Sequence, residues 1–530
     1  MGRRFNVTGS CNPQKHYMVR LDDRLKRIKE YYVDEGSYFV INRGRQYGKT
    51  TTLDALERYL EDDNVVLSLD FQLLGTEEFK DESTFSHSFT RYVLSVLNRT
   101  DTDNKESMTA PLQQFVSDRR EYGLVELFTA LSRMCENSPR PVVLMIDEVD
   151  SASNNQVFID FLAQLRGYYP KRNKTPIFHS VILAGVYNIK NLKLKLRPES
   201  EHQYNSPWNI AADFDIDMSF SSKQIAGMLE EYEGDHHTGM DIKAVAEEIY
   251  AYTSGYPVLV SSICKYMDEG ITDEDEFEDM GKPWTKEGVA RAVKKILVTS
   301  APLFESMIRH LDEYPEMKKM FQAILFKGSE FAYNPDTKEI SLACMFGYAV
   351  NKKGRIQIAN RIFETRLYNY FYSEEELSNA IVHMAKRDKS YFVHGNRLDM
   401  DTVMKRFVET FDDIYGKNSE NFVEDNGRKL FLLYLKPIIN GVGNYYIEAR
   451  TRDARRTDVI VDYLGEQFII ELKIWHGNEY NTRGEKQLTD YLDYYHQDKG
   501  YLLSFNFNKN KKTGIKEIKI DDKTIIESVV

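Results

Sequence analysis

Residues 38–51 combine an apolar run with a glycine-lysine-threonine sequence, and this combination can bind phosphate. Tyr38–Asn42 reads as a buried strand, and Gly48-Lys49-Thr50 opens a helical pattern after a short loop. The N-terminus of a helix presents free N–H groups and a positive dipole end to an anion. Lys49 can then reach the β- and γ-phosphates of a nucleotide, and the Thr50 hydroxyl can ligate Mg²⁺.

The loop departs from the GxxxxGK[ST] pattern, because Arg43 occupies the position of the first glycine. Gly44, one residue later, can relieve the tight turn. We predict that the whole loop contacts the nucleotide: Arg43, Gly44, Arg45, Gln46, Tyr47, Gly48, Lys49, Thr50 and Thr51.

A second half-motif follows about a hundred residues later. Val142–Ile146 is an apolar run that ends in two carboxylates, Asp147 and Glu148. In P-loop ATPases the aspartate of such a pair holds Mg²⁺ and the glutamate polarises the attacking water. The same pair could simply cap the helix that follows. Two half-motifs in the right order favour the nucleotide site, and we predict that ATP and Mg²⁺ bind there.

A third constellation lies near the C-terminus, where Asp458 precedes a Glu471-Leu472-Lys473 sequence. Alternate side chains of a strand share a face, so Glu471 and Lys473 project together. If the two strands pair through the turn at 464–466, Asp458 lies near Glu471. Carboxylates are hard oxygen ligands for Mg²⁺ or Mn²⁺, and such a metal can activate water for attack on a phosphodiester. On a surface strand the same residues would be an ion pair only, but the apolar neighbours indicate a buried strand.

The elements that position these residues predict an α/β protein of several domains. In the first third, apolar strands alternate with amphipathic helices, which is typical of a parallel sheet covered on both faces. The strands are Tyr38–Asn42, Val65–Asp70, Val142–Asp147 and Val181–Gly185. Residues 221–300 are mainly helical, with a break at Gly255-Tyr256-Pro257. We place the domains at 1–220, 221–300, 301–385 and 386–530.

The third domain shows two helices, Leu303–Leu311 and Met317–Phe326, and then a hairpin signal at 351–354, which suggests a winged helix. The last domain reads as a mixed α/β unit. Its helices are expected at Met400–Tyr415, Phe422–Leu435 and Glu485–Tyr495, and its strands near Tyr445–Arg450, Asp458–Tyr463, Gln467–Lys473 and Tyr501–Phe505.

Composition excludes several classes of protein. Hydrophobic residues make up 42% and charged residues 29%, so wholesale disorder is excluded. No apolar run approaches the roughly 18 residues of a membrane helix, and the N-terminus leads into no signal-like apolar region. Cys11, Cys135, Cys264 and Cys344 lie far apart without a CxxC pair, which argues against a zinc ribbon or a disulfide framework. We therefore expect a cytoplasmic protein with no membrane partner.

The net charge of −12 is unevenly distributed. From Lys386 onward 24 basic residues balance 24 acidic ones, so the excess lies entirely before that position. Basic residues cluster in the neutral part at Arg450, Arg452, Arg455, Arg456, Lys509, Lys511 and Lys512. A local basic face can bind phosphate on an acidic chain, although a solvated surface would carry the same residues.

The first two motifs resemble those of AAA-like ATPases of bacterial genomes, whose loop reads Arg-x-x-Arg/Gln-aromatic-Gly-Lys-Ser/Thr. Arg43 then follows the family rather than departing from it. Gly255-Tyr256-Pro257 resembles the Gly-x-Pro element of STAND and origin-recognition ATPases, and by that resemblance Pro257 contacts adenine. The element could equally end one helix and start another. The resemblance implies a P-loop core, a helical lid and a winged helix, in a class that often acts as dimers or rings. A homo-oligomer is thus possible, and Tyr187, Asn188, Arg166 and Arg197 are sensor or arginine-finger candidates by position only.

The C-terminal motif resembles the PD-(D/E)xK nuclease superfamily, which implies a restriction-endonuclease-like fold. Gln487 and Tyr491 resemble its Gln-x-x-x-Tyr element, and Glu424 matches a glutamate that often adds a metal contact, with Glu448 as the alternative. By this resemblance Asp458, Glu471, Lys473 and Gln487 are catalytic, and the partner is nucleic acid, DNA rather than RNA. On the winged helix, Lys352, Lys353 and Arg355 suit phosphate contact, as would a solvated hairpin tip.

The leading hypothesis is an ATP-regulated, metal-dependent DNA nuclease, with a defence role against foreign DNA by analogy only. A first rival is a nucleotide-gated switch whose nuclease-like domain only binds DNA or a partner. A second rival is a motor or remodeller that acts on protein, and its ATP turnover would not respond to nucleic acid.

Overall fold

The computed structural model of the chain comprises two compact units. The first comprises Met1–Leu303, Ser341–Val350 and Ala359–Arg361, and the second comprises Phe304–Ile340, Asn351–Ile358 and Ile362–Val530. The structure describes residues 2–118, 122–186, 208, 210–270, 283–327, 329–376, 380–395, 397–415, 424–439, 443–450, 456–463, 466–474, 485, 488–489, 491–493, 497–506 and 512–530.

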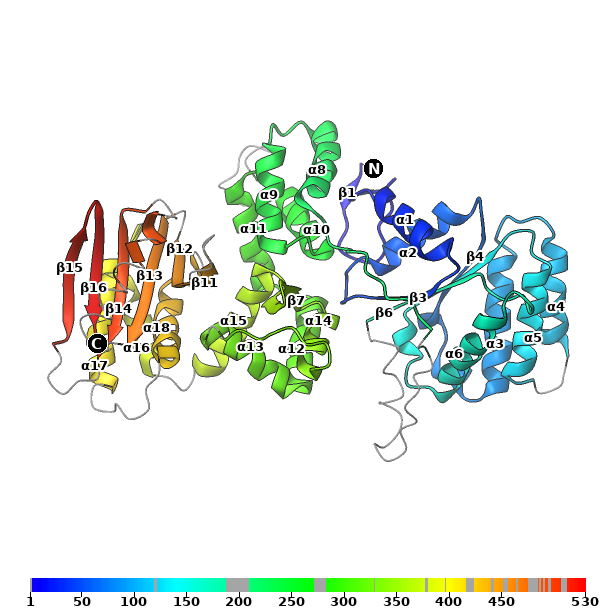
Figure 1. Ribbon diagram of the computed structural model, residues 1–530. Helices are drawn as coiled ribbons and strands as arrows, with labels where there is room; N and C mark the ends of the chain where they lie inside the picture. Colours follow the sequence, from blue (N-terminus) through cyan, green and yellow to red (C-terminus); the bar gives the residue numbers. More distant parts are fainter. Residues whose placement is uncertain are drawn as a thin grey trace, which may run out of the picture. The chain divides into compact units, whose positions relative to one another are not determined.

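A parallel sheet with the strand order β3-β6-β5-β4 forms the centre of the first unit (Figure 1). Its strands are β3 (Tyr38–Asn42), β4 (Val65–Asp70), β5 (Val142–Asp147) and β6 (Ser180–Gly185). All four strands were expected as buried runs, and β5 and β6 are buried at every position. The predicted strands and the parallel α/β core are confirmed.

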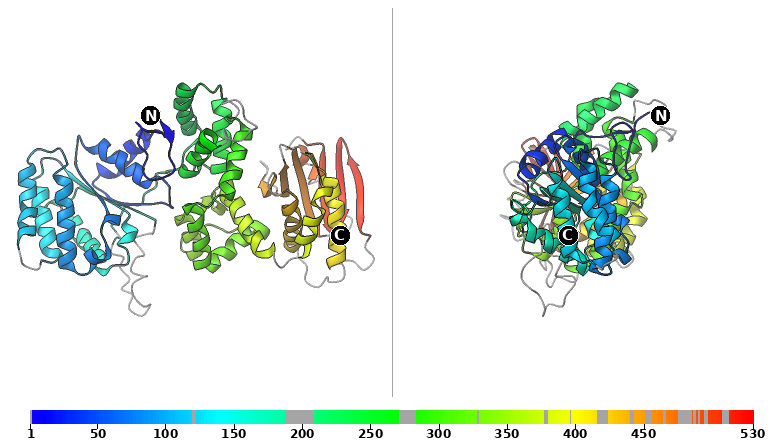
Figure 2. Two further views of the ribbon diagram at one scale, coloured as in Figure 1. Left: turned by 180° about the vertical axis from the view of Figure 1, so that it is seen from behind. Right: turned by 90° about the vertical axis from the view of Figure 1, so that its right-hand side faces the viewer.

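Helices cover both faces of this sheet, as Figure 2 also shows from behind. One face packs against α1 (Asp22–Ile28) and α2 (Lys49–Leu60), and Phe39, Leu53 and Ile182 lie in that core. The other face packs against α3 (Glu82–Leu97), α4 (Lys105–Ser117), α5 (Leu124–Glu136) and α6 (Gln156–Tyr168). Apolar side chains on both faces explain why the strands read as continuous hydrophobic runs.

A helical region follows at α8 (Ser222–His236), α9 (Ile242–Thr253), α10 (Pro257–Lys265) and α11 (Lys286–Val298). The predicted break at 255–257 is confirmed, because α9 ends at Thr253 and α10 begins at Pro257. Gly255 makes the break possible: its φ is +75°, and a Cβ there would lie 1.9 Å from the carbonyl oxygen of Phe220. The Phe220 N–H donates to the Gly255 carbonyl at 2.8 Å.

Gly255→Ala will therefore destabilise the helical region. The left-handed backbone alone costs about 1–2 kcal/mol for a residue with a Cβ, and the contact with Phe220 adds to that cost. Gly234→Ala is the matched control, because Gly234 lies inside α8 and a Cβ there meets nothing within 4 Å. Helix propensity predicts that this control gains about 0.5–1 kcal/mol. Thermal unfolding of the two variants should shift in opposite directions, and equal shifts would contradict the assignment.

Residues 302–376 form α12 (Pro302–Glu313), α13 (Pro315–Lys327), α14 (Lys338–Met345), β7 (Ala349–Lys352), β8 (Arg355–Ile358) and α15 (Arg361–Glu376). The two expected helices and the hairpin are present, and α14 is an addition. Lys353 and Gly354 have φ values of +53° and +80° at the hairpin turn, as the tight turn between twisted strands requires.

The last part of the second unit carries a mixed six-stranded sheet in the order β11-β12-β13-β14-β16-β15. Its strands are β11 (Gly443–Arg450), β12 (Arg456–Tyr463), β13 (Glu466–Ile474), β14 (Lys499–Phe505), β15 (Gly514–Ile520) and β16 (Lys523–Val529). The helices before it are α16 (Ala380–Asp388), α17 (Met400–Tyr415) and α18 (Glu424–Ile439). The expected mixed α/β arrangement is confirmed, but β15 and β16 were not predicted.

The remaining elements are short: β1 (Arg4–Phe5), β2 (His16–Tyr17), β9 (Val393–His394), β10 (Arg397–Leu398), and the 3-10 or π turns η1 (Lys29–Val33), η2 (Phe71–Leu73), η3 (Thr76–Phe79), η4 (Val149–Ser151), η5 (Tyr169–Lys171), η8 (Tyr266–Gly270) and η9 (Lys389–Tyr391). Within the described ranges, no helix has the length and apolar character needed to cross a membrane.

Candidate functional site

The loop between β3 and α2 has the backbone shape of an anion-binding nest. Gln46 and Gly48 both have left-handed backbones, with φ values of +56° and +79°, and α2 begins directly afterwards at Lys49. Left-handed residues in a turn can direct backbone N–H groups toward one side, and the helix N-terminus adds its dipole. The loop can therefore hold phosphate.

Lys49 is 7% exposed, and its ammonium donates to the carbonyls of Arg43 at 3.1 Å and Gly44 at 3.2 Å. Burial lowers the pKa of Lys49, while the nearby carboxylates of Glu148, Asp150 and Asp147 oppose that shift. A desolvated ammonium is destabilised until an anion approaches, which suits the binding of phosphate.

The predicted Mg²⁺ ligands meet at the carboxyl edge of the sheet. The Thr50 hydroxyl donates to Asp147 at 2.6 Å, and the Glu148 amide donates to the same carboxylate at 2.9 Å. Burial raises the pKa of Asp147, and burial together with Asp147 raises the pKa of Glu148. A hydroxyl beside two carboxylates offers the hard oxygen donors that Mg²⁺ prefers, so the residues present fit this ion.

Arg43 and Gly44 face other parts of the unit. The Arg43 guanidinium donates to the carbonyls of Phe214 at 3.3 Å and Ile216 at 3.0 Å, so it holds the segment beside the sheet. Gly44 lies against residue 346, where a Cβ would be 2.4 Å from the Phe346 carbonyl oxygen. Each residue thus has a structural task in addition to its predicted nucleotide contact.

A cavity of about 110 Å³ lies beside the loop, inside the first unit. It brings together five predicted site residues: Gln46, Tyr47, Gly48, Thr51 and Pro257. The rest of its wall comes from the N-terminal segment, α1, α2, Phe220, α8 and α10: Asn6, Val7, Gly9, Cys11, Met18, Val19, Leu21, Arg24, Thr52, Phe220, Met228, Val258 and Ser261. A flat apolar nucleotide base suits a cavity with such a lining, and this cavity is therefore called the base cavity.

Comparison with known proteins places these features in a family. The sequence profile of the AAA-like domain matches residues 9–280, slightly more than half of the chain. The chain belongs to the AAA-like domain family. The loop before α2 and the carboxylates at the end of β5 both lie within the matched range, so the protein is an AAA-like P-loop ATPase.

Among curated proteins, none matches the sequence. Solved structures similar to this AAA-like ATPase include a Walker-type ATPase of Pyrococcus abyssi, with 14% identity, a TM-score of 0.45, and coverage of 68% of this chain and 99% of the other. The ORC1 protein of Aeropyrum pernix in complex with DNA has 11% identity, a TM-score of 0.31, and coverage of 68% and 94%. A RuvB mutant of Thermotoga maritima has 11% identity, a TM-score of 0.31, and coverage of 67% and 95%.

The end of β6, where a sensor side chain was sought in the AAA-like domain, holds a carboxylate from another element. The Val186 amide donates to Asp150 at 2.5 Å, and a Cβ at Gly185 would lie 2.9 Å from the same carboxylate. Asp150 lies in η4, directly after β5. Of the other candidates, Arg166 lies in the last turn of α6, whereas Tyr187, Asn188 and Arg197 lie outside the described residues.

In the C-terminal sheet, β13 carries the predicted glutamate and lysine on one face. Glu471 is 0% exposed, and its carboxylate lies 2.9 Å from the Lys473 ammonium. β12 pairs antiparallel with β13, with Val459 opposite Ile470. Continued by one residue, this register sets the backbone of Asp458 beside that of Glu471.

The other predicted nuclease residues are only partly described. Glu424 begins α18, but its side chain and those of Asp458 and Glu448 lie outside the described residues, as do the whole of Gln487 and the basic residues Arg452, Arg455, Lys509 and Lys511. Tyr491 is fully buried among Ile469, Leu488 and Leu502. Across the described part of the chain, no three His, Cys, Asp or Glu side chains lie close enough to hold a metal ion.

Sequence reasoning missed a second buried carboxylate on the same face of the sheet. Glu527 of β16 is 1% exposed and forms an ion pair with Lys516 of β15 at 2.5 Å. In the sheet, Leu502 pairs with both Glu471 and Glu527, so the two carboxylates flank one strand. The signal lies in residues 523–529, where Ile525 and Ile526 precede Glu527 in a strand-sized run.

Proposed function

We propose that this AAA-like ATPase uses ATP binding and hydrolysis to control metal-dependent cleavage of DNA by residues 386–530. One observation supports the nuclease part of the proposal: Glu471 is fully buried and forms an ion pair with Lys473. The strand pairing, continued by one residue, sets the backbone of Asp458 opposite Glu471. A buried glutamate-lysine pair is costly to desolvate, and a catalytic role accounts for its presence.

The nucleotide half of the proposal assigns one task to each residue. Lys49 and the amides of residues 44–50 bind the phosphates, and the cavity beside Tyr47 and Pro257 takes the base. Thr50 and Asp147 would hold Mg²⁺, which neutralises phosphate charge when bound. Glu148 orients a water molecule and accepts its proton, and its raised pKa makes it a better base near neutral pH.

The nuclease half uses the carboxylates and the lysine of the last domain. Asp458 and Glu471, with Glu424 as an extra contact, would hold Mg²⁺ or Mn²⁺, which lowers the pKa of bound water. Lys473 stabilises negative charge on the phosphodiester, and Gln487 orients the substrate. Lys352 and Lys353 on the hairpin after α14 are exposed and suit contact with the DNA backbone. We also propose that the protein acts as a homo-oligomer.

The direct experiment incubates supercoiled plasmid with the full chain and Mg²⁺ or Mn²⁺, with and without ATP. We expect nicked or linear product that depends on the metal and changes with ATP. Retention of DNA without cleavage under either metal would replace the nuclease by a nucleotide-gated binding switch. If the rate of ATP hydrolysis is the same with and without nucleic acid, the result would favour an ATPase that remodels protein.

A further inference from the structure

The N-terminal segment of residues 3–20, called the strap below, forms contacts within itself as well as with the rest of the unit. β1 and β2 pair in parallel, with Arg4 opposite His16 and Phe5 opposite Tyr17. Within the loop between them, the Asn6 amide donates to the Ser10 carbonyl at 3.2 Å and accepts from the Thr8 amide. The strap therefore has a defined shape.

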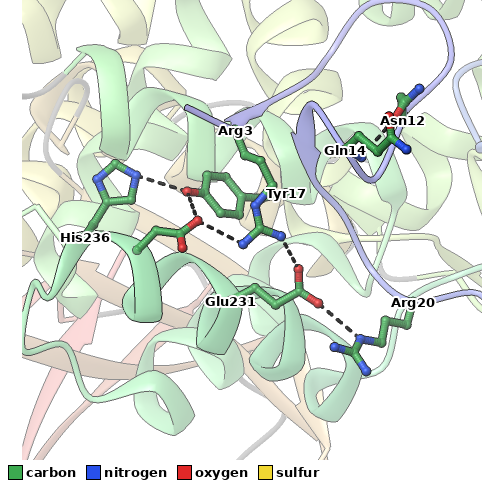
Figure 3. A network of polar contacts seen from close by, with 8 residues as sticks. Arg3, Asn12, Gln14, Tyr17, Arg20, Glu231 and His236 are labelled. Carbon is green, nitrogen blue, oxygen red and sulfur yellow. Dashed lines mark hydrogen bonds and ion pairs between the residues drawn. The ribbon is translucent and has the colours of Figure 1, made fainter. Parts of the chain in front are cut away.

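Both chain ends of the strap are held on helix α8, by ion pairs and a hydrogen bond (Figure 3). The Arg3 guanidinium lies between two carboxylates, at 2.6 Å from Glu231 and 2.9 Å from Asp235. Arg20 contacts Glu231 from the other side at 3.1 Å. The Tyr17 hydroxyl donates to Asp235 at 2.8 Å, and burial raises the pKa of Tyr17 to about 12, so this donor keeps its proton.

Aromatic packing supports the same attachment. Phe5 and Tyr17 of the strap are almost fully buried. The Phe5 ring lies 5.2 Å from Tyr232 of α8 and 5.9 Å from Trp284 before α11. Aromatic pairs at these separations contribute beyond the area they bury, so the strap is fastened to the helical region by both charge and packing.

The middle of the strap is held on the phosphate-binding helix α2. The Cys11 amide donates to the Thr51 hydroxyl at 3.0 Å, and the Ser10 hydroxyl donates to Asp54. Thr51 directly follows Thr50, the partner of Asp147. The strap thus bridges α8 and the first turns of α2.

Between these two attachments the strap forms one wall of the base cavity, through residues that include Val7, Cys11 and Met18. The other walls are the loop before α2 and helices α8 and α10. A base in this cavity touches the strap, α2 and the helical region together. A ligand that binds more tightly when the strap is attached than when it is detached must stabilise the attached state by the same free energy.

We propose that the strap is a nucleotide-dependent fastener, in which the ion pairs of Arg3 with Glu231 and Asp235 keep the base cavity closed and bound nucleotide in turn keeps the strap fastened. This inference rests on the proposed binding of ATP at Lys49. It adds a regulatory role for residues that touch no phosphate.

The test compares Mg·ATP affinity of the full chain with that of Arg3→Met, which keeps the side-chain stem but removes the charge. We expect the dissociation constant to rise at least about fivefold, the lower end of typical coupling between sites. Arg4→Met is the matched control, because Arg4 directly follows Arg3 in the chain but is exposed, and this variant should bind Mg·ATP like wild type. Glu231→Gln combined with Arg3→Met should add less than its separate effect, because the pair is already broken.

Cys11 gives a second readout that does not depend on affinity. Its thiol lines the cavity, so a maleimide followed by peptide mass spectrometry reports closure at that cysteine. We expect ATP to slow the labelling of Cys11 in wild type, and Arg3→Met to speed it without nucleotide. If the wild-type chain does not bind Mg·ATP, both the proposed function and the proposed role of the strap are wrong. If wild type binds Mg·ATP and Arg3→Met shows the same affinity and the same Cys11 labelling, only the proposed role of the strap is wrong.

Discussion

Replacing Glu148 by glutamine will leave ATP bound but slow its hydrolysis by about two to four orders of magnitude, the usual contribution of a positioned base. Glutamine keeps the shape of the side chain but cannot accept a proton from water. Glu148 also has a strained left-handed backbone, with φ at +51°, as residues at functional sites often do. Because the substitution removes a negative charge beside the phosphate site, ATP should bind at least as tightly as in wild type.

Steady-state phosphate release and equilibrium binding of ATP, measured on the same preparation, separate these two effects. Glu77→Gln is the matched control, since Glu77 is exposed on η3 and its replacement should change neither quantity. Wild-type turnover in Glu148→Gln would show that another carboxylate accepts the proton, with Asp150 next to be tested. Loss of ATP binding would instead indicate that Glu148 supports the fold of the loop.

The nucleotide-binding core was predictable because its signals are local. Each strand of the first sheet is buried on both faces, so Val142–Ile146 is a continuous apolar run that only a central strand accommodates. The chemistry then follows at the end of the strand, where Asp147 and Glu148 leave the sheet. Lys49 and Thr50 were predicted as site residues in the same way, at the point where the periodicity changes from strand to helix.

The cavity wall was not predictable from the sequence, because its residues share no pattern. Val7, Cys11 and Met18 lie in a segment without a regular element longer than two residues. Long-range contacts place them beside the loop before α2, among them the attachment of Arg3 and Tyr17 to α8, more than two hundred positions away in the chain. Arg43 illustrates the same limit, since nothing local indicates that its guanidinium binds the carbonyls of residues 214 and 216.

In the C-terminal sheet, residue spacing predicted the pairing of β12 with β13 but not the strands β15 and β16. The register between β12 and β13 agrees with the spacing of Asp458 and Glu471, because only two residues of the sequence separate two strands of similar length. The strands β15 and β16 are harder to detect: residues 514–520 lie at the edge of the sheet and are mostly exposed. Edge strands often carry lysines that discourage pairing with other chains, and these lysines make the strand resemble a loop.

Glu471→Gln will abolish DNA cleavage and leave ATP hydrolysis at the wild-type rate. The variant removes a carboxylate that the proposal assigns to the metal, while Lys49, Asp147 and Glu148 are unchanged. It also leaves the Lys473 ammonium without its partner at 2.9 Å. Breaking one side of a buried ion pair costs about 3–5 kcal/mol, so lost cleavage could reflect unfolding of the domain instead of lost chemistry.

The double variant Glu471→Gln with Lys473→Met separates these explanations. Removing both charges is often nearly neutral for stability, so the thermal transition should return toward that of wild type while cleavage stays absent. Glu517 and Lys519 provide the matched control, because they repeat the Glu-x-Lys spacing on β15 at 3.8 Å, with side chains 55% and 76% exposed. The corresponding Glu517→Gln and Lys519→Met double variant should cleave DNA normally. Cleavage by a folded Glu471→Gln, Lys473→Met protein would show that this pair stabilises the sheet and performs no chemistry.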